Sequence, residues 1–401
     1  MNEQIKQRIT QLNNGEVPIG YEKTDFGIFP CDWVTDKKLK DLGSFGKGKG
    51  LPGDKMTTEG VPCVGYGDIY MKYNHFHFEE AQTFVDEKTA SESQPIHKGT
   101  LLFTGTGETA DEIGKCVCYN GDETIYAGGD IITFVADKVN PLFLAYQQYQ
   151  EFSLRKKASF GQGHSVVHIQ RENLEKLNVA YPKSTEEQSK IAEILMKWDE
   201  AIELQEAYLE LILFKKSYLI KHLMMPQKHW ISIEMQAVGE LYQPMTISEI
   251  DLTDTGYTVY GANGEIGFYH TYNHEQSEIA ITCRGSTCGQ VTFTKPKSWI
   301  TGNAMVFKVD ENKFDKNFLY YYCCSLGFKK IISGSGQPQI IRQAFQKFLF
   351  HIPADKSEQR KIANLLVSVD EYVNVQTEKL NILKKQRKAL QQYLLNGIVR
   401  V

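Results

Sequence analysis

Two glycine-rich regions of the sequence carry side chains whose types suit hydrogen bonding to nucleic acid. Arginine and lysine can donate to guanine, glutamine and asparagine can pair with adenine, and serine and threonine hydroxyls can reach phosphates or base edges. Glycine turns let the backbone approach a duplex closely. The first set is Lys47, Lys49, Tyr66, Tyr70, Thr104, Thr106, Arg155, Lys156, Lys157, Gln162, His164, His168 and Arg171. The second set is Tyr260, Asn263, Arg284, Ser286, Thr287, Lys329, Lys330, Gln337, Gln339, Arg342 and Gln343.

Ordinary solvated loops would explain any one of these residues as well as binding does. The sets, however, occupy similar places in two successive parts of the chain. That agreement favours two binding surfaces over two accidental clusters.

Patterns of known catalytic or metal sites are missing from the sequence. Gly46–Lys49 (GKGK) and Gly105–Thr109 (GTGET) lack the GK[ST] ending that a phosphate-binding Walker loop needs. The ten histidines are scattered, and neither a Ser/His/Asp arrangement nor an HExxH pattern occurs. The sequence therefore predicts a chain without catalytic residues, without a metal and without a cofactor of its own.

Two long helical segments with the same sequence pattern must position these sets. The first runs from Ser184 to Met224 and the second from Asp355 to Leu395, an offset of 171 residues. Ser184 and Asp355 are good N-cap residues, and a glutamate three positions later, Glu187 or Glu358, fits a capping box.

Both segments repeat apolar residues at alternating steps of four and three, which is the pattern of a coiled-coil seam. The first seam is Ile191, Leu195, Trp198, Ile202, Gln205, Leu209, Ile212, Lys216, Leu219 and Leu223. The second seam is Ile362, Leu366, Val369, Val373, Gln376, Leu380, Leu383, Arg387, Leu390 and Leu394. The polar interruptions coincide, so we expect the two helices, each about 60 Å long, to pack against each other along their seams. If they run antiparallel about a pseudo-two-fold axis, Gln205 and Gln376 should lie in contact as a register lock. The alternative is that each helix packs only on its neighbouring globular region.

Bulk composition indicates a soluble protein of several domains. The 401 residues are 41% apolar and 23% charged, and no run approaches the length of a membrane span. Eight cysteines without CxxC spacing and a polar N-terminus fit reduced thiols in a cytoplasm. A net charge of −4 argues against a chain that binds nucleic acid by itself, but allows one that binds it together with a more basic partner.

The chain reads as a tandem repeat of a globular region followed by a long helix. We predict an N-terminal helix and lead over 1–17, globular regions over 18–182 and 226–353, and helices over 183–225 and 354–401. Strand patterns cover 101–104, 115–119 and 131–135 in the first region, and 257–260, 279–283, 290–293 and 304–309 in the second, with helices near 143–153 and 318–326. The ending of Gln7–Gly15 resembles Gln391–Gly397, so the two chain ends should lie together.

The sequence resembles one known family, the DNA specificity subunits of type I restriction-modification systems. The resemblance covers nearly the whole length and is carried by the openings Pro182–Ala192 and Pro353–Ala363, by Tyr260–Gly267, and by Gly334–Pro338. It implies an α+β fold with two target-recognition domains of mixed β-sheets, separated by an antiparallel pair of helices in a pseudo-two-fold tandem repeat. The N-terminal helix with its lead to Trp33 is a departure from the pattern.

The resemblance also implies partners. Two modification subunits would bind S-adenosylmethionine and methylate adenine, and a restriction subunit would cut DNA with ATP and Mg. The resulting hypothesis is a non-catalytic, cytoplasmic bacterial or archaeal subunit that reads a bipartite, asymmetric site in double-stranded DNA. The alternative is a scaffold whose tandem domains bind proteins or glycans, which would show no dependence on DNA sequence. An enzyme acting alone would need a catalytic constellation.

Overall fold

The computed structural model describes residues 3–73, 76–163, 165–334 and 336–401. The chain forms two compact units, of which the first is Met1–Leu204 with Leu380–Val401 and the second is Gln205–Lys379. Both long helices contribute one part to each unit. None of the helices in the described ranges is long and apolar enough to cross a membrane.

The first unit contains two mixed sheets. The larger has the strand order β4 (Gly43–Lys47), β13 (Ile131–Ala136), β9 (Thr100–Thr104), β11 (Cys116–Tyr119) and β6 (His77–Phe78), and only β11–β6 is parallel. The smaller has the order β7 (Thr83–Val85), β5 (Val61–Val64), β12 (Ile125–Ala127) and β8 (Gln94–Ile96), with β5–β12 parallel. Two-stranded pairs are β1 (Tyr21–Thr24) with β2 (Gly27–Pro30), β3 (Trp33–Lys38) with β15 (Asn178–Pro182), and β10 (Thr106–Gly107) with β14 (Val167–His168).

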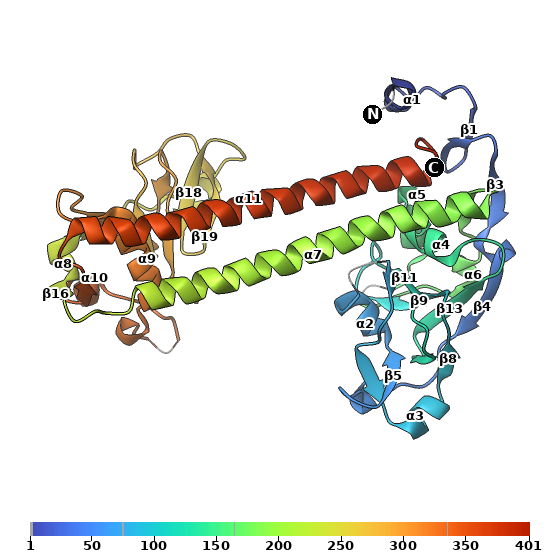
Figure 1. The fold of residues 1–401 in the computed structure, drawn as a ribbon, viewed down its shortest axis with the longest axis horizontal. Helices are drawn as coiled ribbons and strands as arrows, with labels where there is room; N and C mark the ends of the chain where they lie inside the picture. The colour runs from blue at the N-terminus through green and yellow to red at the C-terminus, as the bar shows by residue number, and fades with distance from the viewer. Residues whose placement is uncertain (1–2, 74–75, 164, 335) are drawn as a thin grey trace. The chain divides into compact units, whose positions relative to one another are not determined.

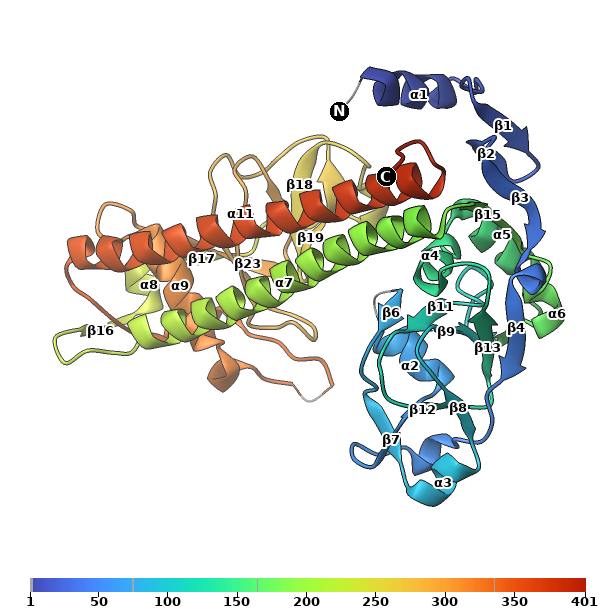
Figure 2. The same cartoon turned by 45° about the vertical axis from the view of Figure 1, so that its right-hand side comes forward.

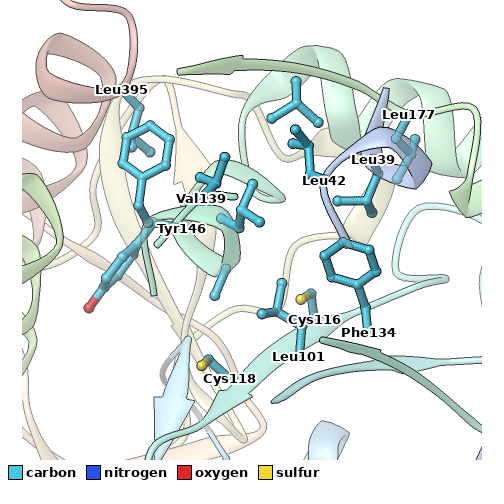
Figure 3. Close-up of a cluster of buried hydrophobic side chains, with 14 of the residues drawn as sticks. Leu39, Leu42, Leu101, Cys116, Cys118, Phe134, Val139, Tyr146, Leu177 and Leu395 are labelled. Atoms are coloured by element: carbon cyan, nitrogen blue, oxygen red, sulfur yellow. The ribbon is translucent and has the colours of Figure 1, made fainter. Parts of the chain in front are cut away.

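The core of the first unit surrounds the central strand β9, which is buried at every residue. Alternating apolar side chains on its two faces pack against different layers, with Leu101 in the cluster of Figure 3 and Leu102 in a second cluster. Phe134 lies on the Leu39 and Leu42 side of the first cluster, and Tyr146 lies on the side of Leu395. The elements around this core are α1 (Glu3–Asn13), α2 (Tyr66–Met71), α3 (Glu87–Ser91), α4 (Pro141–Gln147), α5 (Glu151–Phe160), α6 (Arg171–Leu174), η1 (Leu39–Asp41) and η2 (Gly53–Lys55).

The helix predicted over 143–153 is wrong in extent, because the structure contains two helices there. α4 ends at Gln147, and α5 runs from Glu151 to Phe160. Buried polar groups need partners, and the side chain of Gln147 donates to the Ala180 carbonyl while that of Gln148 accepts from Ser153. Gln150 is extended and starts the second helix. The Gln147 bond thus reaches β15, 33 residues along the chain, whereas the Gln148 bond stays within the break.

The second unit contains one antiparallel and one mixed sheet. The antiparallel sheet has the order β17 (Gly239–Tyr242), β23 (Ala304–Val309), β20 (Ile279–Thr282) and β21 (Val291–Phe293). The mixed sheet has the order β19 (Gly264–Tyr269), β18 (Tyr257–Gly261) and β22 (Trp299–Ile300). The remaining elements are β16 (Ile231–Glu234) paired with β24 (Leu349–Ile352), α8 (Met235–Val238), α9 (Lys316–Leu326), α10 (Arg342–Gln346), η3 (Glu249–Asp251) and η4 (Lys329–Ile331). The strands predicted in both regions and the helix near 318–326 are confirmed within one or two residues.

The two long helices, α7 (Thr185–Leu223) and α11 (Lys356–Leu395), begin and end within a residue of the predicted segments Ser184–Met224 and Asp355–Leu395. The helix predicted over 354–401 is too long, because α11 ends at Leu395. Every seam position is buried or half-buried. Ser184 caps α7 by accepting from the Glu187 amide at 3.3 Å, and Asp355 caps α11 by accepting from the Ser357 amide at 2.8 Å. The capping boxes are not completed, because the Glu187 carboxylate binds Arg400 and the Glu358 carboxylate binds Trp230.

Contacts inside each unit show that the helices run antiparallel, and in both views they lie side by side (Figures 1 and 2). In the first unit, Asp199 of α7 forms an ion pair with Arg387, near the end of α11. In the second unit, Lys216, near the end of α7, pairs with Asp370 of α11. The predicted contact of the two glutamines is confirmed, since Gln205 Nε2 donates to Gln376 Oε1 at 3.0 Å.

The tandem repeat extends to individual hydrogen bonds. Tyr146 donates its hydroxyl proton to Asp199 at 2.8 Å, and Tyr321 does the same to Asp370 at 2.7 Å. Gln188 donates to the Pro182 carbonyl at 2.8 Å, and Gln359 donates to the Pro353 carbonyl at 2.7 Å. Each unit thus anchors its globular region to the start of its long helix in the same way.

The glutamine contact predicts an unusual pattern of stabilities. Gln205→Leu should cost about 1–3 kcal/mol, because it leaves the buried Gln376 amide without its partner. Gln205→Leu combined with Gln376→Leu should restore or exceed the original stability, because leucine continues the apolar seam. Urea unfolding of the single and double variants measures both values. A double variant less stable than either single one would contradict this account.

The chain ends lie together, as predicted. Arg8 donates to the Ile398 carbonyl at 3.1 Å, and the Tyr21 hydroxyl donates to the Gly397 carbonyl at 2.5 Å. Arg400 binds Glu187 at 2.6 Å, whereas in the second unit His229 binds the equivalent Glu358 at 3.0 Å. In the first unit, the C-terminal segment therefore takes the position that the segment leading into the second globular region takes in the second unit. The repeat is thus cyclic in plan.

Candidate nucleic-acid interface

The first set of candidates is divided among several parts of the first unit. Lys47, Thr106, His168 and Arg171 line one cavity of about 410 Å³, together with Asp130. Arg155 and Lys156 line a separate cavity of about 850 Å³ between α5 and the β1–β2 hairpin. Tyr66 lines a third, of about 720 Å³. Lys49 and Gln162 are exposed, and His164 lies outside the described residues.

Two members of the first set, Thr104 and Lys157, are buried, unlike the prediction, and two more, Tyr70 and Thr106, are half-buried. Thr104 is inaccessible to solvent and bonds to the Tyr70 hydroxyl at 2.8 Å. Lys157 is also buried, because its Nζ donates to the Gly114 carbonyl at 2.9 Å and lies over the Tyr149 ring. Thr104 and Lys157 hold the fold together and leave no polar atom for an external ligand.

The second set is mostly exposed. Arg284, Ser286, Lys329, Lys330, Gln337, Gln339, Arg342 and Gln343 all reach solvent. Tyr260 does not, because its hydroxyl is bonded to Glu265 inside the unit. Thr287 donates to the Ala262 carbonyl at 2.9 Å and lies 3.0 Å from Asn263 Oδ1, so this pair fixes the loop over β20.

The two units share one backbone framework at the end of a buried inner strand, β9 in the first unit and β20 in the second. In the first unit, the Gly105 amide donates to Asp130 and its carbonyl accepts from Ile169, at 2.7 and 3.0 Å. In the second, the Cys283 amide donates to Asn303 and its carbonyl accepts from Ile340, at 3.1 and 3.0 Å. A two-way exchange of backbone hydrogen bonds then joins Gln162 with His168, and Ser333 with Gln339.

Each framework carries two facing residues, which we call the tip pair. In the first unit it is Thr106 and His168, which are partners across β10 and β14. In the second it is Arg284 and Gln339, which form an isolated antiparallel bridge. Thr106 Oγ1 lies 3.1 Å from His168 Nδ1. No hydrogen bond joins the Arg284 and Gln339 side chains to other residues in the described ranges, and both are exposed.

Some neighbours of the tip pairs were missed from the sequence. Asp130 and Asn303 hold the frameworks through their carbonyl groups, so their side-chain types gave no signal. Lys115 was also missed, although it lies over the ring of the candidate Tyr70, and burial lowers the pKa of Lys115. The matching order of Thr104–Thr106 and Thr282–Arg284 after a buried strand was a signal that could have paired the two frameworks.

The buried Lys157 predicts a pH-dependent stability. Burial lowers its pKa from 10.5 to about 8, so between these pH values the unfolded chain binds more protons and stability should rise with pH. The rise is on the order of 3 kcal/mol. Lys157→Met should remove it, while Lys156→Met at the exposed neighbour should keep it. Urea unfolding at pH 7.5 and pH 10 measures the difference, and equal pH dependence in all three proteins would contradict this account.

Comparison with known proteins finds relatives along most of the chain. The family model for the type I restriction modification DNA specificity domain matches residues 30–213 and 228–385. The type I restriction enzyme MjaVIII specificity subunit of Methanocaldococcus jannaschii is 22% identical and covers 93% of this chain and 94% of its own. A putative MjaX specificity subunit from the same organism is 22% identical, covering 95% and 97%.

Two solved structures share the fold. The S subunit of a type I restriction-modification system from M. genitalium has a TM-score of 0.61 at 16% identity, and covers 90% of this chain and 96% of its own. A chain from a study of complex assembly and conformational transition in a type I R-M system has a TM-score of 0.56 at 13% identity, covering 96% and 100%.

Proposed function

The chain belongs to the family of type I restriction-modification DNA specificity proteins, and we propose that it reads a bipartite, asymmetric site in double-stranded DNA. Its two globular regions are then target-recognition domains, each reading one half of the site. Methylation and cleavage at that site are carried out by partner subunits.

The observation that supports this proposal most directly is the pair of matched frameworks with different side chains. The hydrogen bonds at Gly105 and Cys283 correspond one for one, so the two domains present the same surface element. Thr106 and His168 on one, and Arg284 and Gln339 on the other, would meet different bases. Equivalent domains with different side chains suit two half-sites of unequal sequence.

The outer faces of the long helices support the presence of partner subunits. In the second unit, Phe214 and Tyr218 of α7 are 70% and 65% exposed, and Val375 of α11 is 62% exposed. Apolar groups of this size are common at protein interfaces. We assign these faces to modification subunits that carry S-adenosylmethionine, with ATP and Mg bound by a restriction subunit. The net charge of −4 is consistent with a chain that binds DNA together with such partners. No observation favours the scaffold that binds proteins or glycans.

Sequencing of methylated DNA tests the proposal. The chain is expressed in a host that lacks its own type I systems, together with modification subunits from the organism that supplies the chain. Adenine methylation should appear at one motif with two specified halves and an unspecified spacer, and should disappear without this chain. One contiguous motif, or methylation that does not require the chain, would contradict the proposal.

A further inference from the structure

We propose that the tip pair of each recognition domain reads base edges, and that Arg284 and Gln339 select a guanine and an adenine in their half-site. This inference rests on the proposed function and deepens it, because it reduces many candidate residues to two in each domain.

The position of the tip pair suits it to direct readout. In the first domain, β9 is the central strand of the larger sheet and is buried along its length, and the chain passes through Gly105 directly to Thr106. In the second, β20 is buried along its length and is followed by Cys283 and Arg284. Sites attached to rigid elements hold their side chains more precisely than sites in long loops.

The backbone also fixes the position of the second member of each tip pair. His168 follows a turn at Gly163, which has a φ of 122°, and Gln339 follows a turn at Gly334, which has a φ of 90°. A Cβ atom at Gly163 would lie 1.9 Å from the Val166 carbonyl oxygen, and at Gly334 2.6 Å from that of Gln337. Both turns therefore require glycine, and both position the second member of the pair.

On this shared backbone, the chemistry of the two pairs differs completely. The Arg284 guanidinium matches O6 and N7 of guanine, and the Gln339 amide matches N6 and N7 of adenine. Both side chains are exposed, and neither has a hydrogen-bond partner in the described ranges. Thr106 and His168 are already bonded to each other at 3.1 Å, which leaves His168 Nε2 to meet a base. A recognition domain that keeps one backbone and changes only these two side chains can bind different base sequences.

Phosphate contact is the competing role for these residues, and other cations near the tips suit it better. Lys329 and Lys330 are exposed on η4, and Arg171 and Arg342 begin α6 and α10, each three residues after the second member of a tip pair. Contacts to phosphate set affinity and register without carrying sequence information, whereas base contacts change which sequence is bound.

The two roles are separated by single substitutions assayed through sequencing of methylated DNA. With Arg284→Ala or Gln339→Ala, one position of the second half-site should lose about 10- to 100-fold of its discrimination, while the first half-site stays unchanged. The matched control is Lys329→Ala with Lys330→Ala, which should lower methylation evenly at all sites without changing the motif. If the alanine variants at the tip also lower methylation evenly, the residues contact phosphate and the proposal is overturned.

Exchange of the pairs provides the stronger test. Thr106→Arg with His168→Gln should introduce guanine and adenine into the first half-site, and Arg284→Thr with Gln339→His should give the second domain the preference of the first. Thermal unfolding checks that each exchanged protein folds. Unchanged half-sites in folded proteins would overturn the tip assignment while leaving the bipartite motif intact, whereas no bipartite motif with the unaltered chain would refute the proposed function itself.

Discussion

Arg387→Met is expected to destabilise the first unit by about 3–5 kcal/mol, the cost of leaving a buried carboxylate without its partner. Arg387 Nε lies 2.7 Å from Asp199 Oδ1, and the two side chains are only 10% and 5% exposed. Its guanidinium also lies over the rings of Phe76 and Tyr146, at 4.5 and 5.5 Å from the centroids. The substitution therefore removes charge compensation and packing at once.

The chain supplies a matched control for this prediction. Lys216 and Asp370 occupy the equivalent place in the second unit, but their side chains are 24% and 28% exposed. Lys216→Met should therefore cost less than Arg387→Met, about 1–3 kcal/mol, because the Asp370 side chain is partly exposed although its Oδ1 atom, which faces Lys216, is itself shielded from solvent. Hydrogen exchange of the α4 amides in the first unit and of the α9 amides in the second measures each cost separately. Equal costs in the two units would show that burial does not decide the strength of these pairs.

A double variant separates the charge from the packing. Asp199→Leu combined with Arg387→Met removes both charges of this buried pair, so it should recover most of the stability that Arg387→Met loses. The recovery should be incomplete, because the Tyr146 hydroxyl then loses its acceptor. A double variant as unstable as Arg387→Met would mean that lost packing, and not an unpaired charge, is the main cost.

The sequence predicted the long helices almost to the residue because their pattern is local and long. The seam repeats through ten positions in each copy, and its defects at Gln205 and Gln376 specified a contact that the structure contains. The break between α4 and α5 was not predictable, because it depends on a bond from Gln147 to Ala180, which is distant in the chain. The capping boxes failed for the same reason, since Arg400 takes the Glu187 carboxylate.

The candidate interface was predictable in residue type but not in arrangement. Composition around the glycine turns indicated both sets, yet it could not separate Thr106 and His168, which meet across two strands, from Lys157, which is buried. Burial and strand register depend on contacts between segments far apart in the chain. The shared framework consists of backbone hydrogen bonds at Gly105 and Cys283, which the types of the side chains do not specify.

Lengthening both helices by four residues is expected to change the unread spacer and leave both half-sites unchanged. If the two long helices set the separation between the recognition domains, four residues add about 6 Å to it. Base pairs in B-DNA rise by about 3.4 Å, so the spacer should grow by one or two base pairs. Methylation at the original sites should fall to background, since a reader displaced by a base pair loses all its contacts in that half-site.

The antiparallel register suggests how the insertion should be made. Gln205 pairs with Gln376, so duplicating 204–207 in α7 and 375–378 in α11 places each copy of one glutamine opposite a copy of the other. The buried amides then stay paired, and the seam continues on both sides. Duplicating only one segment is the control, because it leaves the helices mismatched and should weaken the unit that contains the extra residues. Sequencing of methylated DNA reads the outcome. An altered half-site with unchanged spacing would contradict the view that the helices act as a ruler, because it would place the effect of the insertion in the readers themselves.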